Sequence, residues 1–319
     1  MKTKRKFLDK IIGQTSLKRE LEFYLEGYEK TGYWMPSIFS ANRGSGKSLM
    51  VKALAAELSE INKKKGMSKG KAFLTINSSE ISDSEILFDK VLPLLAQEGD
   101  IFLFLDESEN LPQKVQCALL SLLTCDDNYN SQYHLSDGTC YEINHKRFTF
   151  AGAASSFGGI HPDLIDRLKR FSFQAYTDDD LSKILVKKLP KMTFKDEALA
   201  KLVSTLRSSP RHAVARSNDL KMMDTAHFDM AAFKKLRHAL SIFPLGLNRD
   251  EIALLKVLQR GNATLTELSA RLGRTKMSVM DDLEVFLKSK ELIKTQGARG
   301  RVLTPKGILV LQEIDAIIS

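Results

Sequence analysis

The stretch of sequence that decides the fold is residues 41–48, which read Ala-Asn-Arg-Gly-Ser-Gly-Lys-Ser. It matches the phosphate-binding pattern G-x-x-x-x-G-K-S/T, except that Ala41 stands in the place of the first glycine. In such a loop, backbone N–H groups surround phosphate oxygens, a lysine neutralises the β- and γ-phosphates, and a hydroxyl reaches Mg²⁺. The stretch therefore predicts binding of a nucleoside triphosphate together with Mg²⁺. We expect the contacts to come from Gly44, Ser45, Gly46, Lys47 and Ser48.

The residues on both sides of this loop predict the structural context that a phosphate loop needs. Residues 37–40 are typical of a short strand, and residues 49–58 are rich in Ala, Leu and Met, as a helix is. The N-terminus of that helix would face the phosphates, where its N–H groups and dipole favour anions. The alternative is a glycine-rich turn with a solvated lysine, which explains neither flank. The methyl group of Ala41 restricts φ at the turn.

Length and composition are those of a soluble globular protein with more than one domain. The chain has 319 residues, 43% of them hydrophobic and 27% charged, so two or three domains are expected. No apolar run approaches the length that spans a bilayer, and residues 7–10 interrupt the basic start before it could form a secretory signal. The 3 cysteines form no C-x-x-C pair, which argues against a disulfide framework or zinc site and favours a reducing cytoplasm.

The order of apolar and helical stretches predicts an α/β fold followed by two smaller domains. Up to residue 176, short apolar runs alternate with helical stretches, as in a parallel sheet covered by helices. Residues 177–243 show helical periodicity without a convincing strand, which predicts a small all-α domain capped by the acids at 178–180. Pro244-Leu245-Gly246 then breaks the pattern. The predicted domains are 1–176, 177–243 and 244–319, and the predicted strands are 38–39, 72–76, 101–105, 148–151 and 171–173.

Two acidic residues follow the most apolar of these strands. Residues 101–105 read Ile-Phe-Leu-Phe-Leu, as a central strand buried on both faces requires, and Asp106 and Glu107 come next. The acids would lie at the carboxyl edge of the sheet, where α/β proteins bind ligands. We expect Asp106 to join Ser48 in holding Mg²⁺, and Glu107 to orient the attacking water, with Lys47 as its catalytic partner. The plain alternative is that the two acids cap a helix.

The last predicted domain has the pattern of a winged helix. Residues 264–267 read Thr-Leu-Thr-Glu, a capping box for a helix that runs to Leu272 and ends at Gly273. A second helix is expected over residues 276–288, and a hairpin over residues 293–304. A helix-turn-helix followed by a basic hairpin is the arrangement of a winged helix, which binds DNA in many proteins and docks onto other proteins in some.

Charge supports DNA as the ligand of that domain. The net charge is +9, and basic residues outnumber acidic ones over residues 183–237 and again over residues 288–306. Such runs are often only solvated helical faces, but beside a winged-helix pattern they favour a nucleic-acid surface. Arg299 and Arg301 near the hairpin tip are the expected phosphate contacts, because that contact needs exposed cations on a projecting loop.

The order of these motifs resembles the RuvB family of AAA+ ATPases, and the resemblance spans nearly the whole chain. It implies an AAA+ nucleotide-binding core, a helical lid and a winged-helix DNA-binding domain. The motifs that carry it are Ile12-Gly13-Gln14, residues 41–48, Asp106-Glu107, residues 152–155, Asp166-Arg167 and Ser209-Pro210-Arg211, followed by the winged-helix pattern.

The resemblance also implies roles for single residues. Ile11 and Ile12 match the segment that packs on adenine, and Ser155 matches the sensor 1 position near the γ-phosphate. Arg167 matches the catalytic arginine finger, which reaches the nucleotide of a neighbouring subunit and so requires an oligomer. Arg211 matches sensor 2. Because the preceding proline places it in the first turn of a helix, where the dipole disfavours a cation, a negative partner is expected there.

For function, the resemblance implies an ATP-driven, helicase-like motor that moves Holliday junctions or other branched DNA in recombination and repair. It further implies a ring, with six subunits expected, and a RuvA-like junction-binding partner. Two alternatives share the same motifs: an ATP-switched helicase loader or replication initiator, and a protein-remodelling ATPase. Residues 126–145 depart from the family, because the hairpin that docks on RuvA is polar here and carries Tyr129, Tyr133 and Tyr141.

Overall fold

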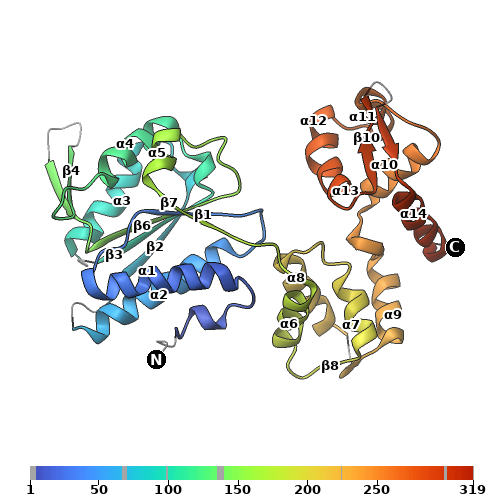
Figure 1. Cartoon of the computed structure of the whole chain (residues 1–319), viewed down its shortest axis with the longest axis horizontal. Helices are drawn as coiled ribbons and strands as arrows, with labels where there is room; N and C mark the ends of the chain where they lie inside the picture. Colours follow the sequence, from blue (N-terminus) through green and yellow to red (C-terminus); the bar gives the residue numbers. More distant parts are fainter. Residues whose placement is uncertain are drawn as a thin grey trace. The chain divides into compact units, whose positions relative to one another are not determined.

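The computed structural model has two compact units (Figure 1). The first unit holds residues 1–183 and 209–211, and the second holds residues 184–208 and 212–319. The boundaries of the three predicted domains stay a prediction. Within the whole chain, the described residues are 5–66, 70–97, 100–134, 140–223, 225–297 and 300–318.

A five-stranded parallel sheet forms the centre of the first unit, in the order β2-β3-β6-β1-β7. Every residue of the apolar run in β3 is fully buried, and all seven residues of β6 are buried as well. Strands covered on both faces need such continuous apolar runs. The predicted α/β fold is therefore confirmed. The strands are β1 (Ser37–Ser40), β2 (Ala72–Asn77), β3 (Ile101–Asp106), β6 (Phe148–Ala154) and β7 (Lys169–Ser172).

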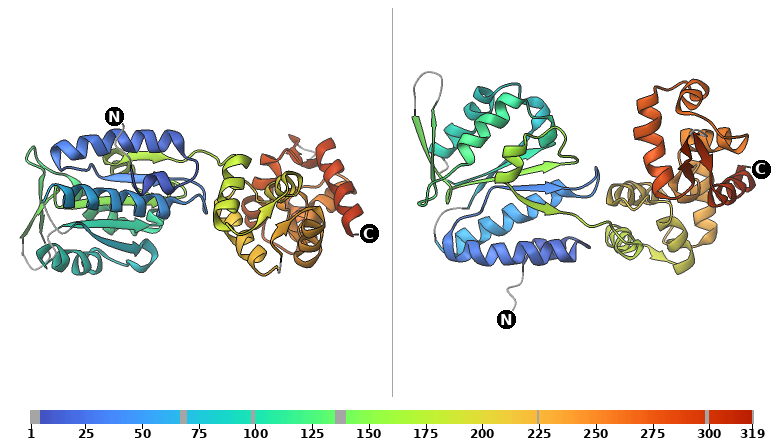
Figure 2. Two further views of the ribbon diagram at one scale, coloured as in Figure 1. Left: turned by 90° about the horizontal axis from the view of Figure 1, so that it is seen from below. Right: turned by 45° about the horizontal axis from the view of Figure 1, so that its top comes forward.

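Helices cover both faces of the sheet, and strand β3 shows how the sequence assigns them (Figure 2). Successive side chains of a strand point to opposite faces. Phe102 and Phe104 pack with helices α1 and α2, whereas Leu103 and Leu105 pack with α3, α4 and α5. The helices are α1 (Thr15–Thr31), α2 (Lys47–Lys64), α3 (Ser84–Gln97), α4 (Gln113–Leu123) and α5 (Pro162–Arg167), with short 3₁₀ turns at Leu8–Lys10, Ser78–Glu80 and Ser108–Asn110.

The polar segment at residues 126–145 folds into an antiparallel hairpin of β4 (Asn130–His134) and β5 (Cys140–Asn144). Its tip, residues 135–139, lies outside the described residues. Tyr133 stacks on Phe88 of α3 at a centroid distance of 3.8 Å, and Tyr129 lies against Tyr33 at 4.4 Å. Aromatic contacts therefore fix the base of the hairpin to the core.

The helical segment after the sheet departs from the prediction in two respects. It is not all-α, because β8 (Thr193–Phe194) and β9 (His227–Phe228) form a short parallel pair. The cap of its first helix is Thr177, which exchanges hydrogen bonds with Asp180, so the acids at 178–180 lie in the first turn instead. The helices are α6 (Asp178–Lys188), α7 (Asp196–Val203), α8 (Pro210–Lys221) and α9 (Met230–Leu240).

The C-terminal part has the predicted winged-helix elements. Thr264 and Glu267 form the capping box of α11 (Leu265–Leu272), and Gly273 ends that helix at a φ of +63°. The second predicted helix is present, but its middle part, Val279–Glu284, is π-helical between α12 (Lys276–Ser278) and α13 (Val285–Ser289). The hairpin strands are β10 (Ile293–Thr295) and β11 (Arg301–Leu303), and the remaining elements are the turn Pro244–Gly246, α10 (Arg249–Gln259) and α14 (Pro305–Ile318).

A buried carboxylate fixes the hairpin of the winged helix to its helices. The side chain of Glu284 is 2% exposed and accepts hydrogen bonds from Arg301 Nε at 2.6 Å and from Lys288 Nζ at 2.6 Å. Arg301 belongs to β11, so this ion pair sets where the hairpin lies. Because both charges have left water, each depends on the other for compensation.

No helix among the residues that the structure describes is both long and apolar enough to cross a membrane.

We predict that Glu284→Gln lowers the free energy of unfolding of the winged helix by about 3–5 kcal/mol, because it leaves Arg301 without its buried counter-charge. Amide hydrogen exchange over residues 249–318 measures this. The matched control is Glu291→Gln, whose exposed pair with Lys306 should be worth about 0–1 kcal/mol. Equal effects of the two substitutions would contradict the prediction.

Candidate nucleotide-binding site

The loop between β1 and α2 has the backbone geometry of an anion cradle. Gly44 and Gly46 adopt φ values of +82° and +90°, in the left-handed region that side chains disfavour. Gly46 is also the N-cap residue of α2, a helix of 18 residues, so the first N–H groups of that helix point toward the loop. A helix N-terminus opening onto glycine amides is suited to phosphate oxygens.

Lys47 lies folded across this cradle. Its side chain is buried, and its Nζ donates to the carbonyl oxygen of Ala41 at 2.7 Å and to Ser155 Oγ at 3.1 Å. Burial lowers the pKa of the Lys47 amine, while Glu109 and Asp106 act in the opposite direction. Among the described residues, no carboxylate forms an ion pair with it. A partly desolvated cation of this kind gains by contacting a phosphate.

Ser48 and Asp106 meet at the edge of the cradle. Ser48 Oγ donates to Asp106 Oδ2 at 2.6 Å, which joins the first turn of α2 to the end of β3. A hydroxyl and a carboxylate are oxygen ligands of the type that Mg²⁺ takes beside substrate phosphates. In the part of the chain that the structure describes, no three His, Cys, Asp or Glu residues gather to hold a metal on their own. The donor pair therefore fits a cation that also uses phosphate oxygens.

Glu107 has an unusual backbone conformation for a residue with a side chain. Its φ is +55°, and its N–H donates to Asp106 Oδ1 at 3.0 Å. The left-handed conformation costs energy for a non-glycine residue, and such residues gather at functional sites. The turn directs the Glu107 side chain into the cavity, where its Oε2 lies 3.4 Å from Asn110 Nδ2.

Glu109 is a neighbouring acid that sequence reasoning missed. Its Oε1 accepts from the backbone N–H of Ser155 at 3.1 Å, and its Oε2 is buried without a hydrogen-bond partner among the described residues. Glu109 thereby holds Ser155, the residue that follows β6 and is predicted to be sensor 1, beside Lys47 of the loop. The only signal in the sequence was a third acid soon after Asp106 and Glu107, which does not reveal where a turn directs it.

Arg211 completes the cavity. It lies in the first turn of α8, as expected, and a Cβ built on Gly44 would come within 3.0 Å of Arg211 Cβ. The guanidinium therefore lies beside the phosphate loop, where an anion would compensate its unfavourable place at a helix start. The cavity has a volume of about 270 Å³ and is lined by Arg43, Gly44, Ser45, Gly46, Lys47, Ser48, Leu49, Asn77, Asp106, Glu107, Ser155 and Arg211.

Three of the residues predicted to contact the nucleotide lie outside this cavity. Ile11 is 8% exposed and belongs to the core formed with α1 and α2, and Ile12 is half-buried next to it. Arg167 is exposed at the end of α5, where its Nη1 donates to Thr124 Oγ1. An exposed position away from the cavity of its own subunit is where a finger acting on a neighbour would lie. The roles of all three stay predictions.

Of the two arginines expected to contact DNA, the structure describes only Arg301. Arg299 lies outside the described residues. Arg301 is not the exposed cation that the sequence suggested, because only 15% of its side chain is exposed and its guanidinium is paired with Glu284. Side chains alternate between the two faces of a hairpin strand, and Arg301 falls on the face that packs against the helices.

Two protein-family models match separate parts of the chain. A model of the ATPase family associated with various cellular activities (AAA) matches residues 37–178, and a model of the RuvB C-terminal winged helix domain matches residues 244–312. The first of these describes the sheet with its phosphate loop, and the second describes the C-terminal winged helix. The two models together cover the phosphate loop, the acids after β3 and the winged helix, whereas Ile11, Ile12 and Arg211 lie outside both matches.

Curated relatives extend the likeness over nearly the full length. The Holliday junction branch migration complex subunit RuvB of Campylobacter lari is 24% identical over 319 residues, covering 95% of this chain and 89% of that protein. Its counterpart from Enterococcus faecalis is 26% identical, covering 94% and 88%. The solved structure of Thermotoga maritima RuvB has the same fold, with a TM-score of 0.72 at 22% identity over 96% of this chain and 97% of that one. The chain is a RuvB-like AAA+ ATPase.

Proposed function

We propose that this protein is an ATP-driven motor that moves Holliday junctions or other branched DNA in recombination and repair. The observation that carries the proposal is that a RuvB-type winged helix and an AAA core occupy one chain. Its relatives from Campylobacter lari and Enterococcus faecalis are named as branch-migration subunits, and the likeness runs over most of their length. A helicase-like coupling of hydrolysis to DNA movement is part of this proposal.

ATP is the proposed substrate of the cavity in the first unit. The amides of Gly44, Ser45 and Gly46 would bind its phosphate oxygens, and Lys47 would exchange its bonds to Ala41 and Ser155 for the β- and γ-phosphates. Arg211 would contact the γ-phosphate. Because ADP lacks this group, Arg211 would have its anionic partner in the ATP state and lose it in the ADP state. These roles fit the buried lysine and the placement of Arg211 beside Gly44.

The hydrolytic step would depend on the acids at the end of β3. Glu107 would orient a water toward the γ-phosphorus and accept its proton as the bond to the leaving oxygen breaks. Asp106 and Ser48 would hold Mg²⁺, which when bound neutralises charge on the phosphates. Glu109 would keep Ser155 in place through its backbone N–H.

A ring of subunits, six in number, would complete the site. Arg167 would reach the nucleotide of the adjacent subunit, spreading positive charge onto the transferring phosphoryl group. The β4–β5 hairpin would be the docking site for a RuvA-like protein, and its polar surface implies a partner surface of matching polarity. The cytoplasmic location inferred from composition stays a prediction.

We predict that Glu107→Gln retains ATP binding but slows hydrolysis at least about 100-fold, because the amide cannot accept the proton of the attacking water. Lys47→Ala should instead weaken ATP binding by about 10- to 100-fold, as expected for loss of a charge-assisted contact. Equilibrium nucleotide binding and steady-state phosphate release distinguish the two effects. Normal turnover in either variant would refute the assignment of the site.

We predict that Arg167→Ala spares ATP binding and lowers hydrolysis about 1,000-fold. The matched control is Arg170→Ala, which removes an exposed arginine three residues away that pairs with Asp166 at 3.4 Å and lies over the ring of Phe157. Mixing Arg167→Ala and Glu107→Gln subunits should restore part of the activity, because one kind of interface in a mixed ring then has both residues. If the mixture stays inactive although its subunits exchange, action across the interface is excluded.

We predict ATP-dependent migration of a synthetic four-way junction, faster with a junction-binding protein than without it. Glu107→Gln protein serves as the control. If the wild-type protein hydrolyses ATP in a DNA-stimulated manner but does not migrate the junction, the loader or initiator alternative is favoured. Binding to DNA that does not weaken with rising salt would favour the protein-remodelling alternative, because phosphate contacts always show that dependence.

A further inference from the structure

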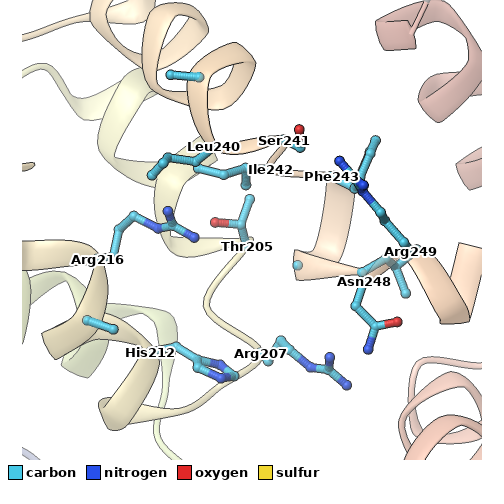
Figure 3. A pocket seen from close by; sticks show the side chains of 14 residues that line it. Thr205, Arg207, His212, Arg216, Leu240, Ser241, Ile242, Phe243, Asn248 and Arg249 are labelled. Carbon is cyan, nitrogen blue, oxygen red and sulfur yellow. The ribbon is translucent and has the colours of Figure 1, made fainter. Parts of the chain in front are cut away.

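The second unit contains a cavity of about 680 Å³ that the proposed ATPase cycle does not use (Figure 3). On one side lie Thr205, His212 and Arg216, and on the other lie Asn248 and Arg249 at the start of α10. Among the described residues that line it there are several cationic side chains and no Asp or Glu. Apolar residues such as Leu240, Ile242 and Phe243 line it as well, but the charge of the lining favours an anion as the ligand.

Arg207 forms a rigid wall of the cavity and is not itself available to a ligand. Its two terminal nitrogens donate to Glu251 at 2.7 and 3.2 Å, and its guanidinium lies 3.6 Å from the ring centroid of Phe286. The side chain of Glu251 is fully buried and also accepts from the backbone N–H of Asn248. This neutral, tightly bonded pair connects the loop before α8 to α10, so the cavity has a fixed shape.

The guanidinium of Arg216 has an N–H donor without a hydrogen-bond partner among the described residues. One terminal nitrogen reaches Asp219 Oδ2 at 3.0 Å, and Nε is buried without a partner among the described residues. A guanidinium carries five N–H donors, and those left unbonded in a partly buried group cost free energy. In Figure 3 the guanidinium of Arg216 points toward Thr205, across the cavity. An acceptor with several oxygens would satisfy it.

Arg249 lies in an electrostatically unfavourable position. It is the first residue of α10, where the helix dipole disfavours a cation, and it forms no ion pair with any described residue. Asn248 and Glu251 already cap this helix, so Arg249 contributes nothing to the cap. An anion bound beside Arg249 would compensate its positive charge and would itself interact favourably with the N-terminal end of the helix dipole.

We propose that the cavity binds a phosphate oxyanion, attracted by Arg216 on one side and Arg249 on the other, and that its physiological source is the phosphodiester backbone of DNA. Arginine forks match the geometry of phosphate oxygens better than any other side chain does. The site would be separate from the hairpin of the winged helix. It also lies on α8, the helix whose first turn carries Arg211, so the DNA contact and the nucleotide contact share one element. The DNA source rests on the proposed function, whereas the oxyanion site does not.

The test compares Arg216→Gln/Arg249→Gln with Lys234→Gln/Lys235→Gln, which removes the same charge from exposed positions on α9. Binding of duplex DNA is measured by fluorescence anisotropy at several salt concentrations. The cavity variant should lower the affinity about tenfold at fixed salt and reduce the slope of log K against log salt by about one. The α9 variant should change both quantities by much less. The single variant Arg249→Gln changes only an exposed residue at a helix start, so it should fold even if the double variant does not, and it should also lower the DNA affinity.

A second arm identifies the source of the oxyanion. Titration calorimetry with inorganic phosphate is carried out in Lys47→Ala protein, so that the phosphate loop contributes little. Loss of DNA affinity in the cavity variant, with or without loss of phosphate binding, supports the DNA source. Loss of phosphate binding alone supports a free phosphate ligand. If wild-type protein binds no DNA, the proposed function fails while the phosphate arm still tests the cavity. Unchanged DNA and phosphate binding in the cavity variants would overturn the proposal.

Discussion

The hydrogen bond between Ser48 and Asp106 is the contact on which the geometry of the nucleotide site depends. It connects the first turn of α2 to the last residue of β3, across 58 positions of the sequence. Glu107 takes its place from the same carboxylate, because its N–H donates to the other oxygen of Asp106. The loop, the two proposed Mg²⁺ ligands and the residue proposed to orient water thus depend on one contact, and a shift of β3 relative to α2 would disturb all three.

Buried carboxylates serve the second unit in a comparable way. Glu251 joins the loop before α8 to the start of α10, and Glu284 joins the second helix of the winged helix to its hairpin. Each is almost inaccessible to water and each is satisfied by an arginine fork. Buried pairs of this kind add little net stability compared with apolar residues, but they exclude other arrangements, because any slip leaves a charge unpaired. Orientation between elements, rather than stability, is what they supply here.

Much of the fold and part of the site could be predicted because the decisive signals are local. The phosphate loop, the apolar strand before Asp106 and the capping box at Thr264 are each contained in a few consecutive residues. The misses concern contacts between distant residues. The burial of Arg301 depends on a glutamate 17 positions earlier, and the role of Glu109 depends on the neighbouring strand β6. The two-residue strands β8 and β9 are too short to show any periodicity.

The β4–β5 hairpin is a two-stranded ribbon, and such a ribbon is at best marginally stable in water by itself. The contacts of Tyr133 with Phe88 and of Tyr129 with Tyr33 therefore stabilise the hairpin. Phe88 belongs to α3, which packs on the sheet face that includes Leu103 and Leu105. The hairpin and the sheet should consequently open as one cooperative unit, so a protein that binds the hairpin also stabilises β3, the strand that precedes the proposed catalytic residue Glu107.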